Sequence, residues 1–307
     1  MSSLKSLAQD YHVLVESDNL PQRRMRLLQA LWREEQGYPI GEHNGRLLGS
    51  RLPMPYAEDT LNNYLTDTIK AIVRTEVMTP ENRQGRLFGM PRIYNDLLSS
   101  QPLCFNLFGE LRQDLPLATR VFRALTNDRV GEVIAIDFEH SPGRGDVRYT
   151  GDKSAFDVFV EFKTPQNGNG FIGIEVKYHE NLKVKADNHR ARYDEVANMM
   201  GCFVNDKRES LQRPPLQQIW RDHLLSGALR HIDQYEDGFF VFLYPQENTL
   251  CANAVQNYEN CLSNSDTFEA WTFNDVVTNL RRFTQAKWVN VFYDRYMNFD
   301  KIEKLLV

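Results

Sequence analysis

Apolar residues in the first 125 positions recur every three or four residues, which is the spacing of helices that bury one face. The pattern predicts a helix over residues 20–35 and a second over residues 58–77, which Pro80 would stop. A stretch rich in Gly and Pro, residues 37–55, separates the two. Shorter helices are predicted at residues 93–98 and 117–125.

The pattern changes to short apolar runs after residue 130, and these runs predict a sheet. Strands are expected at residues 130–139, as a hairpin within residues 154–180, and at residues 238–244. The last of these runs is apolar throughout, as in a central strand covered by helices. Helices are predicted at residues 188–200 and 216–232. Beyond residue 245 the pattern predicts a helix at 252–262, a strand at 268–272, and helices at 275–283 and 286–297.

The hairpin within residues 154–180 reads SAFDVFVEFKTPQNGNGFIGIEVKYHE, with a polar, Gly-rich turn between two alternating strands. Side chains of a strand alternate between faces, so Glu175 and Lys177 share one face and Tyr178 lies on the other. If the apolar sets of the two strands come together, Asp157 comes close to Glu175 and Lys177. This requires Asp157 to lie opposite Glu175 or opposite Lys177, because a slip of one residue would reverse every side chain.

Two carboxylates beside an ammonium group indicate a particular chemistry. Carboxylate pairs bind a hard cation such as Mg²⁺, and a neighbouring Lys can orient or help deprotonate an attacking water. The hairpin therefore predicts a metal-dependent hydrolytic site formed by Asp157, Glu175 and Lys177.

An Asp at the head of a strand, a hairpin and then Glu-x-Lys in an apolar strand resemble the PD-(D/E)XK nuclease superfamily. The segments SSQPLCFNLFGEL, SAFDVFVEF, GFIGIEVKYHE and QQIWRDHLL together resemble one subfamily of largely uncharacterised bacterial proteins. The resemblance extends from about Arg51 to Tyr296, although Phe156 replaces the Pro of the name. It implies that Asp157, Glu175 and the backbone carbonyl of Val176 hold the metal, and that Lys177 is the catalytic lysine.

The fold implied by the resemblance is α/β, with a restriction-endonuclease-like core of order αβββαβ and a mixed central sheet flanked by helices. The predicted order of helix, three strands, helix and strand matches it. We expect an N-terminal helical cap (1–98), a nuclease core (99–245) and a C-terminal extension with helical additions (246–307), all packed as one compact unit.

Composition narrows the function classes. Hydrophobic content of 42% and charged content of 25% are ordinary for a globular protein. No apolar run approaches the roughly 20 residues that span a bilayer, and the N-terminus lacks the pattern of an export signal. Four scattered cysteines without C-x-x-C pairing argue against a zinc ribbon or a disulfide scaffold. We therefore expect a cytoplasmic protein, without membrane association and without a bound organic cofactor, since Gly-rich phosphate loops are also missing.

Accessory site residues are expected beyond the core triplet. Gln218 and Arg221 are three residues apart near the start of the 216–232 helix and share a face, from which a phosphate or a metal ligand could be contacted. An exposed polar helix start is the alternative. His179 falls on the face of Glu175 by alternation. The superfamily often adds an acid from the helix that opens the core, for which Glu110 and Glu76 compete.

The resulting hypothesis is a Mg²⁺-dependent nuclease, with Mn²⁺ as a substitute, that hydrolyses phosphodiester bonds of DNA as an endonuclease in bacterial defence or DNA processing. RNA is not excluded as the substrate, and a homodimer or partner proteins of a defence system are compatible with the resemblance. The net charge of −5 is unusual for a protein that holds DNA by charge alone. The alternative is a catalytically inactive nuclease-like subunit that binds nucleic acid or a partner protein.

Overall fold

The computed structural model describes residues 3–185 and 187–306. Contacts divide the chain into two compact units. The helical unit comprises Met1–Arg83, Phe88–Glu110 and Thr284–Val307, and the sheet unit comprises Gln84–Leu87 and Leu111–Phe283. These boundaries differ from those of the predicted cap, core and extension, and that division stays a prediction.

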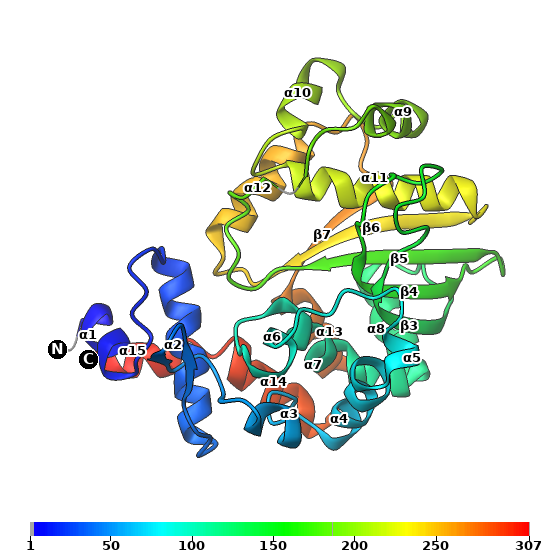
Figure 1. Ribbon diagram of the computed structural model, residues 1–307. Coiled ribbons are helices and arrows are strands. Elements are labelled where there is room, and N and C mark those ends of the chain that lie inside the picture. Colours follow the sequence, from blue (N-terminus) through cyan, green and yellow to red (C-terminus); the bar gives the residue numbers. More distant parts are fainter. Residues whose placement is uncertain (1–2, 186, 307) are drawn as a thin grey trace. The chain divides into compact units, whose positions relative to one another are not determined.

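The helical unit is built from helices, which Figure 1 labels, and one small two-stranded ribbon. Its elements are α1 (Leu4–Asp10), α2 (Leu20–Glu35), β1 (Gly41–His43), β2 (Arg46–Leu48), α3 (Tyr56–Thr60), α4 (Asp67–Val73), the π-helical turn η1 (Arg74–Met78), α5 (Pro80–Arg83), α6 (Arg92–Asn95), most of α7 (Ser100–Gln113), α14 (Lys287–Tyr296) and α15 (Asp300–Leu306). α2 has the predicted bounds and begins with a capping box between Asn19 and Gln22.

The single helix predicted over residues 58–77 is wrong, because the chain breaks it after α3. Leu61 adopts a left-handed conformation with φ of +51°, and α4 begins only after Thr66 caps it. The intervening backbone finds partners outside any helix: the Asn106 side chain of α7 accepts from Leu65 N–H and donates to the Asn63 carbonyl, at 3.0 Å each. Buried side chains of other elements thus replace the helical hydrogen bonds that the apolar spacing predicts.

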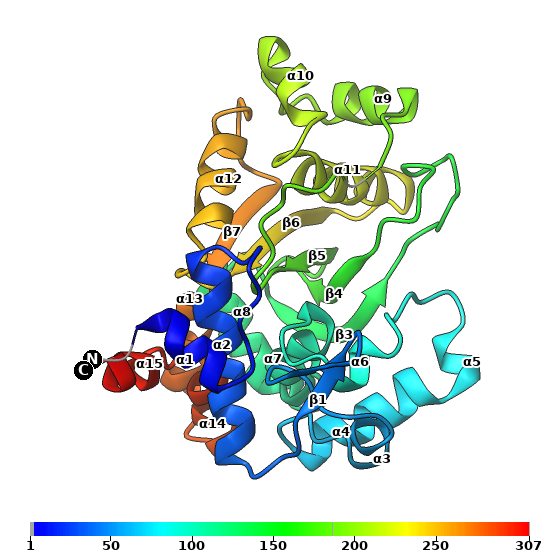
Figure 2. The ribbon, with the colours of Figure 1, turned by 60° about the vertical axis from the view of Figure 1, so that its left-hand side comes forward.

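The sheet unit contains the predicted strands in a five-stranded mixed sheet of order β3-β4-β5-β6-β7. Its elements are α8 (Leu115–Leu125), β3 (Glu132–His140), β4 (Phe156–Lys163), β5 (Asn169–Val176), α9 (Ala191–Met200), the 3₁₀ turn η2 (Asn205–Lys207), α10 (Arg208–Leu211), α11 (Gln217–Ile232), β6 (Asp237–Tyr244), α12 (Thr249–Glu259), β7 (Phe268–Thr272) and α13 (Phe273–Phe283). β3, β4 and β5 are antiparallel neighbours, and β6 and β7 continue the sheet in parallel (Figure 2).

Helices cover both faces of this sheet (Figure 1). α11 lies over one face of the sheet, and α9 and α12 pack in the same hydrophobic core. The predicted core residues of α11 were Ile219, Leu224 or Leu225, and Ile232; the first three are buried and Ile232 is only partly buried. α8 and α13 lie on the other side, where the Phe122 ring of α8 meets Trp271 of β7. Burial on both faces explains why β5 and β6 are buried along nearly their whole length.

Two expectations from composition can be compared with the structure. All four cysteines are buried free thiols, so they form no disulfide scaffold and pack as small apolar residues. Among the residues that the structure describes, no helix is both long and apolar enough to cross a membrane.

Candidate active site

Asp157 and Glu175 lie opposite each other at one end of the β4–β5 hairpin. Val158 pairs with Ile174, so the next residues outward, Asp157 and Glu175, are direct neighbours on one face. This is the first of the two registers that the sequence predicts. The Asp157 carboxylate also accepts a hydrogen bond of 2.9 Å from Val176 N–H, which anchors it to β5.

Lys177 follows β5 and brings its ammonium group to the two acids. Glu175 is 6% exposed and Lys177 7% exposed, and their side chains form a close ion pair. The backbone N–H of Lys177 donates to the Leu243 carbonyl of β6 at 2.9 Å, so the lysine is held against the sheet. The three residues therefore converge, as the alternation predicts, and they do so in a largely buried position.

The charges of this cluster change one another's pKa values. Burial and the Glu175 carboxylate raise the pKa of Asp157 well above its usual range, and the Lys177 charge only partly opposes this. Burial by itself would lower the pKa of Lys177, but Glu175, Glu180 and Asp157 raise it above its usual value. Two buried carboxylates beside one ammonium carry an excess of negative charge, which an additional cation would relieve.

Gln218 reaches the cluster from α11. Its side-chain amide donates to Glu175 Oε1 at 2.7 Å, so this carboxylate is held by Lys177 from its own strand and by Gln218 from the covering helix. A hydrogen bond from a helix to this carboxylate can orient Glu175, which is the task of a positioning residue. The structure thus brings the predicted accessory residue Gln218 into contact with the site.

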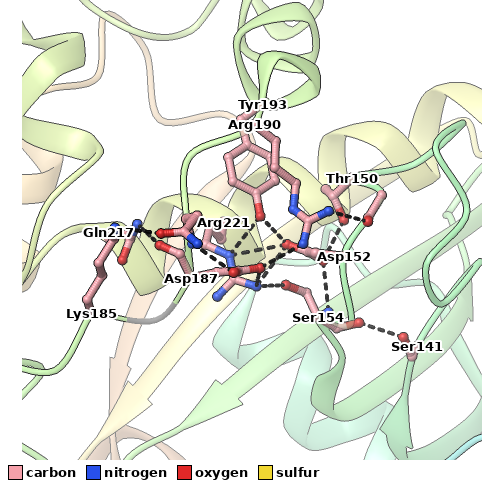
Figure 3. A network of polar contacts seen from close by, with 12 residues as sticks. Ser141, Thr150, Asp152, Ser154, Lys185, Asp187, Arg190, Tyr193, Gln217 and Arg221 are labelled. Atoms are coloured by element: carbon pink, nitrogen blue, oxygen red, sulfur yellow. Dashed lines mark hydrogen bonds and ion pairs between the residues drawn. The ribbon is translucent and has the colours of Figure 1, made fainter.

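Arg221 lies three residues further along α11, but it pairs with a different acid. We expected it to pair with Asp157 or Glu175, and this expectation is wrong. Its guanidinium donates to Asp152 Oδ2 at 2.8 Å and to Ser154 Oγ at 3.0 Å (Figure 3). The Tyr193 hydroxyl donates to the same Asp152 oxygen.

Asp152 and Arg221, which belong to the network in Figure 3, are both buried. Asp152 is 4% exposed and accepts at its second oxygen from the Thr150 hydroxyl and from Ser154 N–H. Burial alone would raise the pKa of Asp152, but Tyr193 and Arg221 lower it to about 2. Asp152 thus joins the segment before β4 to Arg221 of α11 and to Tyr193 of α9. These bonds hold α11, the helix that carries Gln218, in place. Sequence reasoning could not find Asp152, because its partners are 41 and 69 residues away.

Asp222 is a further acid that the sequence analysis missed. It lies one turn beyond Gln218 on α11, is 4% exposed, and its Oδ2 has no hydrogen-bond partner among the described residues. Burial, and next the charge of Glu175, raise the pKa of Asp222 well above its usual range. The sequence did contain a signal for Asp222: it is four residues after Gln218, and residues at this spacing share a face of a helix.

Glu139 flanks Asp157 on the side away from Glu175, and the sequence analysis missed it as well. The pairs Phe138–Val158 and His140–Phe156 surround it, so Glu139 on β3 lies next to Asp157 on β4. Its charge contributes to the raised pKa of Asp157. Glu139 adopts a φ of +52°, which is unusual for a residue with a side chain and often marks a functional position.

The remaining predicted residues stay outside these contacts. β5 ends at Val176, so alternation does not reach His179, whose ring instead lies 3.9 Å from the Glu180 carboxylate. Glu110 lies within α7 of the helical unit and accepts from the Thr66 hydroxyl at 2.5 Å, and Glu76 is buried in η1 of the same unit. Their roles at the site stay predictions, as do those of Asp157, Glu175, Val176, Lys177, Gln218 and Arg221.

A metal would be held here by few protein ligands. Within residues 3–185 and 187–306, no three His, Cys, Asp or Glu side chains gather as a metal site. Asp157 and Glu175 form a pair of hard oxygen donors, which is the donor type that Mg²⁺ prefers with one or two carboxylates and several waters. The chemistry of the pair therefore fits a divalent cation.

Comparison with known proteins agrees with this geometry. The model of the PD-(D/E)XK nuclease superfamily matches residues 16–298, and the chain belongs to this superfamily. No curated protein and no solved structure matches the chain significantly. The order α8, β3, β4, β5, α11, β6 and the mixed sheet confirm the predicted restriction-endonuclease-like fold with its αβββαβ core.

Proposed function

We propose that this protein is a divalent-cation-dependent endonuclease that hydrolyses phosphodiester bonds of DNA, with a role in bacterial defence or DNA processing in the cytoplasm. The observation that carries the proposal is the convergence of Asp157, Glu175 and Lys177 at one end of the sheet in a member of a nuclease superfamily. A site that had decayed into a binding module would be expected to lose one of these groups.

In the proposed mechanism, Asp157 and Glu175 are the acids that hold Mg²⁺ or Mn²⁺, with the Val176 carbonyl as a further oxygen donor. The bound cation would polarise the scissile phosphate and lower the pKa of the attacking water. Val176 N–H keeps the Asp157 carboxylate in place, and Gln218 does the same for Glu175. The geometry of the donor pair is therefore set before substrate binds.

Lys177 supplies positive charge to the reaction. Because the neighbouring acids raise its pKa, the ammonium form is the one present at neutral pH in the free protein. It can donate hydrogen bonds from Nζ to the attacking water or to a phosphate oxygen, and so position the water and stabilise negative charge that develops on phosphorus. Accepting a proton at Nζ would first require the surrounding acids to be neutralised.

The test is plasmid nicking with Mg²⁺ or Mn²⁺, with and without EDTA, by the wild-type chain, Asp157→Asn and Glu161→Gln. Glu161 is a matched control because it lies on β4 four pairs inward from the site, where it accepts from the Tyr235 hydroxyl at 3.2 Å. We expect EDTA and Asp157→Asn to abolish nicking and Glu161→Gln to leave it unchanged. Equal loss in both variants, or nicking that persists in EDTA, would refute the proposal.

A further inference from the structure

Arg144, in the loop between β3 and β4, carries a guanidinium group that the protein does not satisfy. Its Nε, Nη1 and Nη2 atoms are buried and have no hydrogen-bond partner among the described residues. The nearest acid is Glu139, whose carboxylate lies 3.8 Å from Nη2, beyond hydrogen-bonding distance. The side chain as a whole is 18% exposed.

Such an arrangement is costly for a residue with a purely structural role. A guanidinium group has five N–H donors, and each buried donor left unpaired costs about 1–3 kcal/mol. Arg221, in the same unit, shows the usual solution, with hydrogen bonds to Asp152, Tyr193 and Ser154. An unsatisfied buried group in a native fold needs an explanation, such as a bound water or ion or a functional role.

The position of Arg144 relates it to the acids of the site. Glu139, its neighbour, lies beside Asp157, which in turn lies opposite Glu175. A phosphodiester that approaches these three carboxylates brings further negative charge. A cation next to Glu139 can therefore lower the electrostatic cost of bringing the phosphate in.

Other arginines approach the same strand. Arg86 and Arg112 lie 3.9 and 3.8 Å from the Asp137 carboxylate, two residues before Glu139 on β3. β3 is an edge strand, so its outer side is not covered by another strand. Arg86, Arg112 and Arg144 together place three guanidinium groups along its C-terminal half, despite the net negative charge of the chain.

We propose that Arg144 binds a backbone phosphate of the nucleic acid, leaving Glu139 and donating two N–H groups to the phosphate oxygens. This inference rests on the proposed nuclease function and adds a substrate-binding residue to it. The planar guanidinium fork matches a phosphate in this bidentate geometry. The Arg144 side chain is 18% exposed, so part of it already reaches the surface of the loop.

The test is the salt dependence of binding to a short fluorescent DNA duplex in EDTA, where cleavage is blocked. Arg144→Gln is compared with Arg148→Gln, which removes the same charge from the same loop. Arg148 is a suitable control because it is 71% exposed and already pairs with Asp146. Fluorescence anisotropy over a range of salt concentrations gives the affinity and the number of phosphate contacts.

We expect Arg144→Gln to weaken binding roughly tenfold and to lower the slope of log K against log salt by about 1. Arg148→Gln should change neither, and Arg144→Lys should keep the slope while recovering only part of the affinity, because a lysine lacks the fork. Since the buried donors of Arg144 are unpaired in the free protein, Arg144→Gln should not lower the melting temperature.

The outcomes separate this inference from the proposed function. If the wild-type chain binds and nicks DNA but the slope of Arg144→Gln equals that of the wild type, the inference is wrong and the nuclease function stands. A lower melting temperature with unchanged binding would show that Arg144 is structural. If the wild-type chain neither binds nor cuts DNA, both proposals are overturned.

Discussion

Replacing Lys177 by Met should destabilise the metal-free protein at neutral pH. Lys177 and Glu175 are 7% and 6% exposed and form an ion pair, and Asp157 lies beside them. Met keeps most of the aliphatic chain and removes only the charge. The variant therefore leaves two acids at the site without the cation that compensates them.

The size of the effect follows from this burial. Removing one partner of a buried ion pair typically costs about 3–5 kcal/mol. We expect about 3 kcal/mol, because Gln218 still donates to Glu175 and a carboxyl group can take up a proton. For a chain of 307 residues that corresponds to a melting temperature lower by roughly 5 °C.

The deficit should depend on pH in a defined direction. The folded-state pKa of Lys177 is raised above its usual value, so its stabilisation is complete below the pKa of an unfolded lysine and is lost only as pH rises through the folded value. The wild-type contribution is therefore constant from mildly acidic to neutral pH. In Lys177→Met the acids can be neutralised only by protonation, so the deficit should shrink as pH falls from about 8 to about 5.

Urea unfolding in EDTA at several pH values measures this effect. Lys163→Met is the control, since Lys163 lies at the other end of the same hairpin and donates to the Asn169 side chain at the surface. The control should change the free energy of unfolding by no more than about 0.5 kcal/mol. The reasoning is refuted if Lys177→Met loses no more than the control at neutral pH, or if its deficit is the same at both ends of the pH range.

Three further predictions concern acids of the sheet unit. Asp157→Asn should reduce nicking by at least about 100-fold and, without divalent cation, melt at the same or a higher temperature than the wild type in calorimetry, because it removes a carboxylate that repels Glu175. The pKa of Asp222 is raised in the folded state, so its stabilisation is lost as pH rises through the folded value. The free energy of unfolding of Asp222→Asn, measured with urea at neutral pH, should therefore be higher than that of the wild type by on the order of 1 kcal/mol. A lower value would contradict the raised pKa. Asp152 has a pKa lowered to about 2, so it stabilises the protein at pH values above the pKa of an unfolded Asp. Asp152→Asn should lower the free energy of unfolding by about 3 kcal/mol at neutral pH, because it leaves Arg221 buried without a carboxylate. This difference from the wild type should vanish as pH falls from about 4 towards 2.

Much of this protein follows from its sequence, because the decisive patterns are local. The alternation of residues along β4 and β5 places Asp157 and Glu175 on one face, and a hairpin with a short turn allows few registers that also bury the apolar residues. The same reasoning applies to α2 and β7, whose observed bounds equal the predicted ones. In each of these elements the hydrogen-bond partners and the buried face lie close together in sequence.

The tertiary structure decided the contacts that join distant segments. The acid that Arg221 meets depends on how α11 lies over the sheet, so Asp152 replaced the expected partners. Glu139 became a neighbour of Asp157 only through the pairing of β3 with β4. The break after α3 arose because Asn106, more than 40 positions away, offers the backbone better-placed partners than another helical turn would. Periodicity predicts which face of an element is buried, but it does not predict how the elements are placed relative to one another. At this site that placement determines which residues each charged group pairs with.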